Sequence, residues 1–437
     1  TLPQPCDTTT LQAAWEAVML HHDALRLRFT RDELGVSAIN SSESGLLFNV
    51  HSLVGLSAQD QQATIDKIVA DETAFDLQTG PLVRVDYFTS DSAADQMLIA
   101  VHHLAVDMPS WRILLEDLWT AYDQVAASES VTLPVKTTAF KQWAERLVSY
   151  AQSDEAKQYA ALWQENQQEP APLPVDWPGG ANTVAATQEV TVKLAAPLTQ
   201  RIQTALAKAY RTQLHEALLA ALAMALSQWN QSETQAIALE GIGREALFDD
   251  VNLSCTVGWF TALYPALLHL PILQDSITQL KAVKEQLRAV PQGGIAYGIG
   301  RYLCQDEAVA SSLAQLPEPQ VSFNYLGNMD RQPIGPENGR PLGGVFGLQR
   351  SAAEVRPYLL DLIAYIAEGQ LHLTLHYSDN VHQAATIDAL AQHIKQTLAE
   401  FVDKAEAVNQ TEFTPSDFPR AKLDQTKLNA LLNKLKK

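Results

Sequence analysis

The residues best suited to chemistry in this chain are two adjacent histidines, His102 and His103, with Asp107 shortly after them. Imidazole has an unperturbed pKa of about 6.5, so it exchanges protons near neutral pH. A carboxylate close by can fix the tautomer and the orientation of such a ring. This stretch therefore predicts acid-base chemistry centred on a histidine.

Two other interpretations of the histidine pair stay open. In an arbitrary protein such a pair is more often packing than catalysis, because many motif matches arise by chance. Histidine and aspartate are also metal ligands, but neighbours on an extended segment point to opposite faces, so only one of the histidines would face a given ion.

The segments around the histidines predict how they are positioned. Residues 97–101 form a short continuous apolar run, which is typical of a buried strand. Ser110 then opens a segment with helical spacing of its apolar residues, and its hydroxyl suits the capping of the first amides. We therefore expect the histidines where a strand leaves a sheet and turns into a helix. The apolar face of that helix consists of Trp111, Leu114, Leu115, Leu118, Trp119 and Tyr122.

Glu240 is another residue placed for acid-base chemistry. Residues 214–229 are apolar nearly all round, as in a helix packed on both sides, and residues 236–239 predict a strand. This strand delivers Glu240 into a turn punctuated by Gly241 and Gly243. From the residues alone, Glu240 is either a solvated loop residue or a group held at a cleft. The first is more common, because carboxylates are rarely buried unpaired.

Length and composition restrict the classes of protein. With 437 residues, of which 46% are hydrophobic, the chain is long enough for two domains with good cores. Its net charge of −19 makes nucleic acid and anionic membrane surfaces unsuitable partners. No apolar run approaches the length of a membrane span, and no basic segment followed by an apolar one opens the chain. Because Cys6, Cys255 and Cys304 are widely separated, we expect free thiols and a reducing, cytoplasmic location.

The chain divides near its middle. Residues 169–183 have the proline and glycine density of a connector, because each proline removes an amide donor and disfavours helix in the residue before it. We therefore predict a first αβ subdomain over residues 1–168, a second over 184–407, and a linker or C-terminal tail over 408–437. A lysine-rich helical pattern occupies residues 423–437 of that tail.

The order His102-His103-x-x-x-Asp107 resembles the signature of the condensation superfamily of nonribosomal peptide synthetases. The continuation SWRILLEDL, residues 110–118, resembles the epimerization branch of that superfamily. The resemblance covers almost the whole chain, and several motifs in the right order are far more specific than one. The further matching segments are EGIGRE at 240–245, TVGWFTALYP at 256–265, PQGGIAYG at 291–298 and FNYLG at 323–327.

The resemblance implies a fold and a reaction. The fold is α/β, with two subdomains like chloramphenicol acetyltransferase arranged as a V around a central tunnel. The substrate is an aminoacyl or peptidyl thioester, and the chemistry is inversion at its α-carbon. Removal of the α-proton creates an enolate whose charge must be stabilised, and inversion needs a proton acceptor on one face and a donor on the other.

The resemblance also implies a role for each site residue. His103 and Glu240 are expected to act on the α-carbon from opposite walls of the tunnel. Asp107 is expected to hold its loop by hydrogen bonds to arginine or backbone groups. Asn324 and Tyr325 are expected to donate hydrogen bonds near the thioester oxygen. The supporting residues are His102, Ser110, Trp111 and Arg244.

Partners follow from the same resemblance. A peptidyl carrier protein, expected as the upstream domain of the same synthetase, would deliver the substrate on its phosphopantetheine arm, and a downstream condensation domain is a further expected partner. No intrinsic cofactor and no metal are expected. Another histidine pair, His21-His22 before Asp23, resembles a packing motif of the family between a helix over 10–22 and a strand over 25–29. We interpret that pair as structural.

Three functions stay open on these residues. Met108 and Pro109 stand where the epimerization branch usually has glycine and valine, and Ile242 stands where it usually has histidine. Glycine permits backbone angles that methionine resists, so these departures favour a catalytically silent domain that docks carrier proteins. A condensation enzyme would share His103 but would not account for Glu240. An epimerase accounts for all of the motifs and is the function that we predict.

Overall fold

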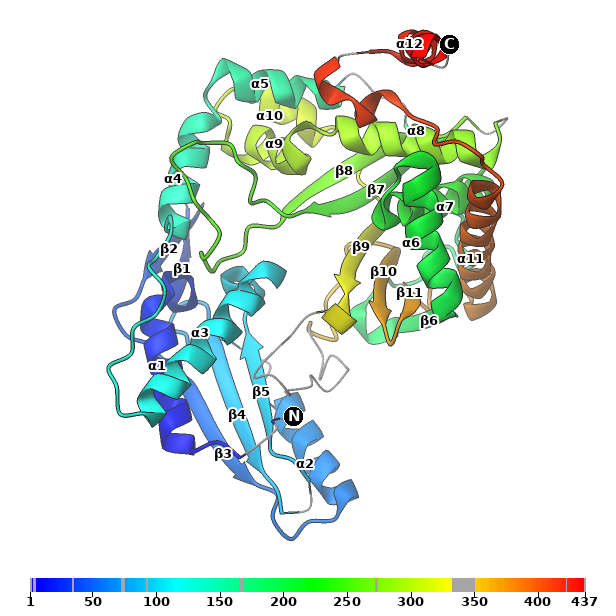
Figure 1. Ribbon diagram of the computed structural model, residues 1–437. Coiled ribbons are helices and arrows are strands. Elements are labelled where there is room, and N and C mark those ends of the chain that lie inside the picture. Colours follow the sequence, from blue (N-terminus) through cyan, green and yellow to red (C-terminus); the bar gives the residue numbers. More distant parts are fainter. Residues whose placement is uncertain are drawn as a thin grey trace. The chain divides into compact units, whose positions relative to one another are not determined.

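The computed structural model places the described residues in two units (Figure 1). The first unit contains the residues up to 149 and residues 244–261, whereas the second contains 150–243, 262–331 and the residues from 350 onward. The structure describes residues 2, 5–33, 35–71, 75–91, 93–164, 169–271, 274–331, 350–421 and 423–435.

Residues 244–261 belong to the first unit although segments of the second unit flank them in the sequence. Side-chain hydrogen bonds attach them: the hydroxyls of Thr256 and Thr137 lie 2.7 Å apart. The units therefore differ from the ranges that proline and glycine density predicted, and residues 169–183 lie within the second unit. Local composition could not indicate this, because the attachment joins residues far apart in the sequence.

The first unit consists of α1 (Thr8–His21), β1 (Leu27–Asp32), β2 (Gly35–Asn40), β3 (Leu47–Ser52), α2 (Ala58–Asp71), β4 (Val83–Thr89), β5 (Gln96–Val101), α3 (Met108–Ala126) and the start of α4 (Phe140–Tyr150). Its main sheet has the order β3-β4-β5, with β3 parallel and β5 antiparallel to β4. Strands β1 and β2 form a separate hairpin. The predicted strand over 97–101 is confirmed as β5, but it is an edge strand whose residues are only partly buried rather than fully buried.

Helices cover both faces of the main sheet of the first unit. Val85 and Tyr87 of β4 lie in a core cluster with α1 and α3, which pack side by side. Phe88 points to the other face, where it joins Ile65 and Val69 of α2 in a smaller cluster. Fully burying one such apolar side chain contributes about 1.5–3 kcal/mol. This packing fixes β5 and α3, the elements on either side of the histidine motif.

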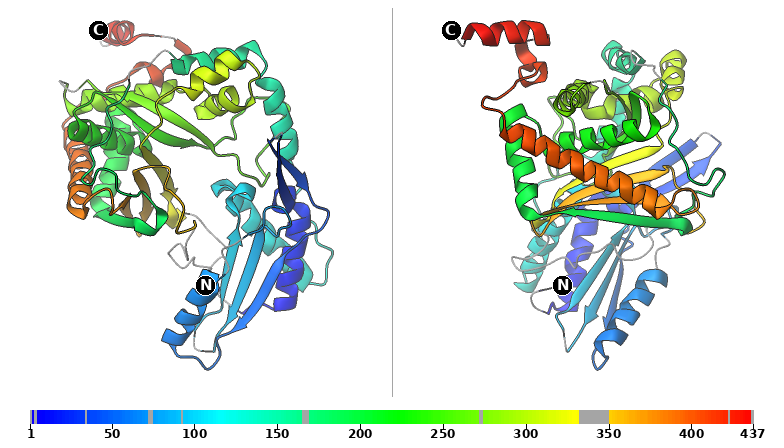
Figure 2. Two further views of the ribbon diagram at one scale, coloured as in Figure 1. Left: turned by 180° about the vertical axis from the view of Figure 1, so that it is seen from behind. Right: turned by 90° about the vertical axis from the view of Figure 1, so that its right-hand side faces the viewer.

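The second unit consists of α5 (Asp154–Ala161), β6 (Thr187–Leu194), α6 (Ala196–Tyr210), α7 (Leu214–Asn230), β7 (Thr234–Gly241), β8 (Ala262–His269), α8 (Ser276–Ala289), α9 (Ile295–Gly298), α10 (Glu307–Ala314), β9 (Val321–Asn328), β10 (Leu360–Ala367), β11 (Gln370–Ser378), α11 (Ala384–Glu406) and α12 (Gln425–Leu435). Its sheet has the order β6-β11-β10-β9-β7-β8. Strand β9 runs parallel to both of its neighbours, β7 and β10. Figure 2 shows α11 lying across a face of this sheet.

The predicted buried helix and its following strand are both confirmed in the second unit. Helix α7 contains buried residues around its circumference, including Ala217, Leu219 and Leu222. Strand β7 alternates its side chains, so Ile237 and Leu239 enter the core of the unit. Glu240 is still part of β7, one residue beyond the predicted strand.

The chain after α11 is bound to the second unit by buried charges. The ammonium of Lys284, which is fully buried, lies 2.8 Å from Asp417 Oδ1, and Arg288 also donates to that carboxylate at 2.9 Å. Burial alone would raise the pKa of Asp417, but the hydrogen bonds from Lys284 and neighbouring groups outweigh it and lower this pKa. The first part of the predicted tail is therefore packed on the second unit.

Membrane-spanning helices and disulfides are two further features on which the sequence made predictions. Within the described ranges, no helix is both long and apolar enough to cross a bilayer. Cys6, Cys255 and Cys304 form no disulfide bonds with one another. The free thiols agree with what the sequence predicted.

Candidate active site

The turn between β5 and α3 positions the histidine motif. A short 3₁₀ turn, η2 (His103–Ala105), follows β5, and α3 then begins at Met108. Asp107 is the N-cap of α3: its backbone is extended, with φ −119° and ψ 177°, and its carboxylate accepts a hydrogen bond from the amide of Ser110. The prediction that Ser110 caps this helix is therefore wrong. Pro109 lacks the amide hydrogen that a first-turn residue leaves unpaired, so the helix starts earlier than its apolar pattern suggests.

Asp107 forms a buried ion pair with Arg244. The guanidinium donates through Nε to Oδ2 at 3.1 Å and through Nη2 to Oδ1 at 2.9 Å. The carboxylate side chain is 2% exposed and the arginine side chain is 11% exposed. Arg244 also donates to the carbonyls of Leu253 and Thr256, and the ring of Phe260 lies 4.0 Å from its guanidinium carbon. Because both partners have further hydrogen bonds, the pair is a satisfied buried one.

Ser110 ties the loop that contains Gly258 to the start of α3. Its hydroxyl donates to Asp107 Oδ1 at 2.5 Å and accepts from the amide of Gly258 at 3.1 Å. The amide of Phe260 in turn donates to Asp107 Oδ2 at 3.4 Å. Asp107 and Ser110 thus fix the backbone on both sides of Trp259.

The adjacent histidines have different surroundings. His102 is half-buried, its Nδ1 accepts from the amide of Leu104 at 3.2 Å, and its ring meets the edge of Phe75. Burial and the neighbouring His103 lower the pKa of His102. His103 is exposed, and its ring centroid lies 5.4 Å from that of Trp259. Within the part of the chain that the structure describes, no hydrogen bond to the His103 ring is found.

Glu240 lies at the carboxyl end of β7, on the exposed surface of the second unit. Strand β9 runs parallel to β7 with Leu239 opposite Phe323, so the register brings Glu240 beside Asn324. Asn324 Nδ2 donates a hydrogen bond to Glu240 Oε2 at 2.9 Å. A carboxylate oriented by a side-chain amide at a strand end can accept or donate a proton.

Two tyrosines of the second unit have raised pKa values. Tyr325 follows Asn324 on β9, but its side chain packs against the hydrophobic core of the unit, on the opposite face of the strand from Asn324. Burial raises the pKa of the Tyr325 phenol. Burial also raises the pKa of Tyr358, and the charges of Asp361 and Glu240 raise it further. Tyr358 was not predicted as a site residue. It precedes β10, so its closeness to Glu240 depends on strand pairing and leaves no local signal in the sequence.

The structure gathers the predicted site residues within each unit. The first unit brings Arg244 to Asp107 and Ser110, across 137 positions of sequence from Asp107. Trp111 is instead partly buried against the hydrophobic core of that unit. The second unit brings Glu240 and Asn324 together.

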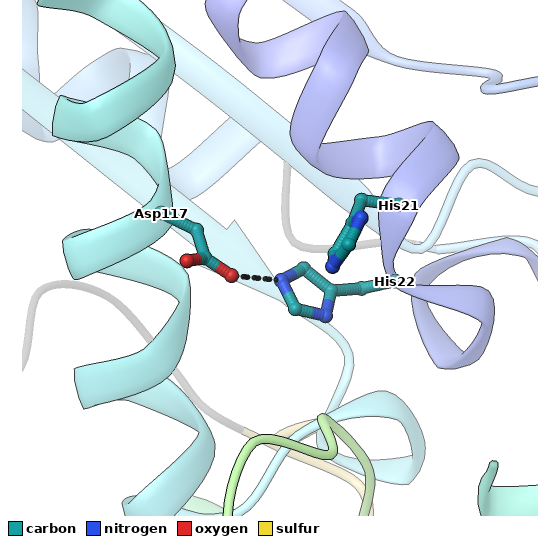
Figure 3. A group of neighbouring side chains, drawn as sticks. All are labelled: His21, His22 and Asp117. Atoms are coloured by element: carbon teal, nitrogen blue, oxygen red, sulfur yellow. Dashed lines mark hydrogen bonds and ion pairs between the residues drawn. The ribbon is translucent and has the colours of Figure 1, made fainter. Parts of the chain in front are cut away.

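The other histidine pair joins α1 to α3 (Figure 3). His22 Nε2 lies 2.8 Å from Asp117 Oδ2, and both side chains are buried. The ring of His21 meets the edge of the His22 ring, with centroids 4.8 Å apart. The side chains of His21, His22 and Asp117 also present possible metal ligand atoms within 4.8 Å of one another. A direct hydrogen bond between His22 and Asp117 accounts for the buried pair without an ion.

The family model and the sequence relatives of this chain indicate the same protein family. The family model for the condensation domain matches residues 1–424. A linear gramicidin synthase of Brevibacillus parabrevis is 40% identical over 445 residues, which cover 99% of this chain and 6% of that protein. Tyrocidine synthase 2 of the same organism is 34% identical, with 98% of this chain and 12% of that protein covered. The chain thus spans only a small part of the length of these relatives.

Solved structures give the same result. The epimerization domain from the third module of tyrocidine synthetase B has a TM-score of 0.82 and 33% identity, and the match covers 92% of this chain and 90% of that one. The X-domain from teicoplanin biosynthesis has a TM-score of 0.69 at 19% identity, covering 92% of this chain and 88% of that one, which shows a shared fold alone. The α/β fold predicted from the motifs is confirmed. The chain therefore belongs to the condensation-domain family of nonribosomal peptide synthetases.

Proposed function

We propose that this domain epimerizes the α-carbon of an aminoacyl or peptidyl thioester held on the phosphopantetheine arm of a peptidyl carrier protein. The observation that carries the proposal is the exposed carboxylate of Glu240, which accepts a hydrogen bond from Asn324 at the carboxyl end of β7. A condensation reaction, the attack of an amine on a thioester, gives no role to this carboxylate. The similarity to an epimerization domain at 33% identity supports the same choice.

The proposed reaction is a pair of proton transfers. One group removes the α-proton, and the electron pair of the broken C–H bond moves to the thioester carbonyl as an enolate. The other group then delivers a proton to the opposite face of the same carbon, so the net change is inversion alone. In the proposal His103 is one of these groups and Glu240 is the other. Tyr325 donates a hydrogen bond to the enolate oxygen.

The remaining predicted residues act as supports in this proposal. Asp107, Ser110 and Arg244 fix the loop around the motif through their buried hydrogen bonds. Asn324 orients the carboxylate of Glu240, in addition to any contact with substrate. Burial lowers the pKa of His102, which favours the neutral form of the ring and suits a structural residue.

The departures from the usual epimerization motif do not favour a silent domain. Met108 and Pro109 occupy the first turn of α3, where a proline is well tolerated, and Asp107 still caps the helix. The side chains of Met108 and Ile242 are 48% and 66% exposed, so neither displaces the buried pair of Asp107 and Arg244. These observations support an active domain.

The proposal is tested by the fate of the α-proton. The carrier protein is loaded with an L-aminoacyl or L-peptidyl group and incubated with this domain in deuterated water, and α-deuteration and the D-isomer are measured together. We expect both to appear in parallel, and to disappear in His103→Ala. The matched control His269→Ala removes an exposed histidine of the second unit and should keep full activity.

Two outcomes would contradict the proposal. Transfer of the acyl group to an added aminoacyl carrier protein, without α-deuteration, would identify a condensation domain. Carrier binding without exchange or transfer would identify a silent docking domain. A downstream condensation domain is the partner proposed to receive the D-isomer, and stereoselective consumption of the D-isomer by the adjoining module tests that step.

A further inference from the structure

A proton-transferring histidine needs a neighbour that holds its ring in the reacting orientation. Asp107 is the carboxylate next to His103 in sequence, yet both of its oxygens accept hydrogen bonds from other groups. Its Oδ1 accepts from Ser110 and its Oδ2 accepts from Arg244 and Phe260. Among the residues that the structure describes, none forms a hydrogen bond with the His103 ring. Among the described residues, Asp107 therefore does not hold this imidazole through a hydrogen bond.

Trp259 is the side chain that contacts the ring. The indole and imidazole centroids are 5.4 Å apart with an interplanar angle of 60°, an edge contact. Trp259 is 41% exposed, which is unusual for a large aromatic residue that could pack in a core. This exposure is explained if the indole packs against an exposed neighbour, the His103 ring.

The backbone around Trp259 is fixed on both sides. The amide of Gly258 donates to the buried hydroxyl of Ser110 at 3.1 Å, and the amide of Phe260 donates to Asp107. A Cβ atom on Gly258 would come within 2.6 Å of Phe140 Cδ2, so a larger residue here would force the Phe140 ring or the loop to shift. The indole is thus presented by a loop that cannot shift easily.

We propose that Trp259 is the positioning residue for His103. Its indole packs against the imidazole and limits the rotation of the ring, in place of the carboxylate that orients the histidine in many catalytic sites. Asp107 then acts on His103 indirectly, because it fixes the loop that presents Trp259. The inference rests on the proposed function for its kinetic part, whereas the ring contact itself is independent of any reaction.

The kinetic test compares Trp259→Leu and Trp259→Phe with the parent domain on carrier-bound substrate. Misplacement of a catalytic group by about 1 Å can cost up to about a hundredfold in rate, so we expect kcat to fall about 10- to 100-fold in Trp259→Leu. KM should stay within about twofold, and Trp259→Phe should recover part of kcat because an aromatic ring remains. The matched control is Trp177→Leu, which removes a tryptophan that is 51% exposed in the second unit.

A second measurement needs neither substrate nor carrier protein. The ring carbons of all histidines are labelled with ¹³C, and the His103 resonance is identified by its disappearance in His103→Ala. A nearby indole displaces this resonance through its ring current. We expect the His103 resonance to move in Trp259→Leu and to stay in place in Trp177→Leu. Thermal unfolding of each variant establishes that it is folded. If Trp259→Leu is not folded, Trp259→Phe takes its place in the resonance measurement.

The two measurements separate the failure of this inference from the failure of the proposed function. An unmoved His103 resonance in Trp259→Leu, or an unchanged kcat, would overturn the positioning role. A rise in KM with unchanged kcat would also overturn it, because Trp259 would then only bind substrate. If the parent domain does not epimerize, the proposed function fails. The resonance then decides whether the ring contact exists: a shift keeps the contact between Trp259 and His103 on which the inference rests, and no shift removes it.

Discussion

Replacing Asp107 with asparagine tests whether this carboxylate holds the site together or takes part in the chemistry. The amide group of asparagine has nearly the same shape as the carboxylate, so the variant changes charge and hydrogen bonding but little else. In one orientation its nitrogen replaces Oδ2 and faces the donors Arg244 Nε, at 3.1 Å, and Phe260 N, at 3.4 Å. In the other orientation it faces the amide of Ser110, at 2.9 Å. Donors therefore oppose donors in both orientations.

The expected cost follows from the burial of the pair. The side chain of Arg244 is only 11% exposed, and in Asp107→Asn it keeps its charge without an anion. Removing one partner of a buried ion pair costs about 3–5 kcal/mol. Arg244 retains the carbonyls of Leu253 and Thr256 as acceptors, so we expect the low end of this range, about 3 kcal/mol of unfolding free energy.

Urea unfolding followed by circular dichroism measures this loss. The control is Glu116→Gln, which breaks an exposed ion pair with Arg112. The side chains of Arg112 and Glu116 are 58% and 61% exposed, so this variant should lose less than about 1 kcal/mol of unfolding free energy. The double variant Asp107→Leu with Arg244→Met should be more stable than either single variant, because no buried charge is left unpaired. If Asp107→Asn unfolds at the same urea concentration as the parent but loses all turnover, the carboxylate acts in the chemistry and the positioning role is wrong.

Three further variants test other parts of the structure. Gly258→Ala forces a Cβ to within 2.6 Å of Phe140 and should cost about 1–3 kcal/mol in urea unfolding, and an unchanged midpoint would refute the tight loop path. Asn324→Ala removes the exposed hydrogen bond that orients Glu240, so kcat should fall about tenfold while the free energy of unfolding changes by less than about 1 kcal/mol, whereas full turnover would dismiss this orienting role. The folded pKa of Asp417 is lowered, so its contribution is complete above its unfolded pKa of about 3.9 and is lost as pH falls through the folded pKa. The unfolding midpoints of Asp417→Asn and the parent should therefore differ at pH 7 and converge below about pH 4, and a difference that stays constant with pH would exclude this linkage.

The sequence predicted those elements that continuous apolar runs define. The helix over 214–229 is present, because burial on nearly all sides demands apolar residues at nearly every position. The strand over 97–101 is also present, although its residues are only partly buried at the edge of the sheet. The start of α3 was misplaced, since Asp107 and Pro109 carry a capping signal that the apolar pattern does not contain. The boundary of the first unit was also beyond prediction, because residues 244–261 join that unit through long-range contacts.

The candidate site divides in the same way. His103 and Glu240 were predicted from residue type and from their places at strand ends, which are local properties. The partner of Asp107, Arg244, lies 137 residues away, and the contact of Asn324 with Glu240 depends on the parallel register of β7 and β9. Trp259 lay inside a recognised motif, but its contact with His103 exists only in the folded loop.

We propose that His103 and Glu240 exchange protons with opposite faces of one α-carbon. Washout of α-deuterium from L- and D-aminoacyl thioesters on the carrier protein tests it most directly, with the parent, His103→Ala and Glu240→Gln compared. Each isomer presents its proton to a different group, so Glu240→Gln should slow washout from one isomer more than from the other. The control Glu189→Gln, which changes an exposed glutamate of β6 in the same sheet, should slow neither. Equal loss for both isomers in Glu240→Gln, with normal binding of the loaded carrier, would contradict the account.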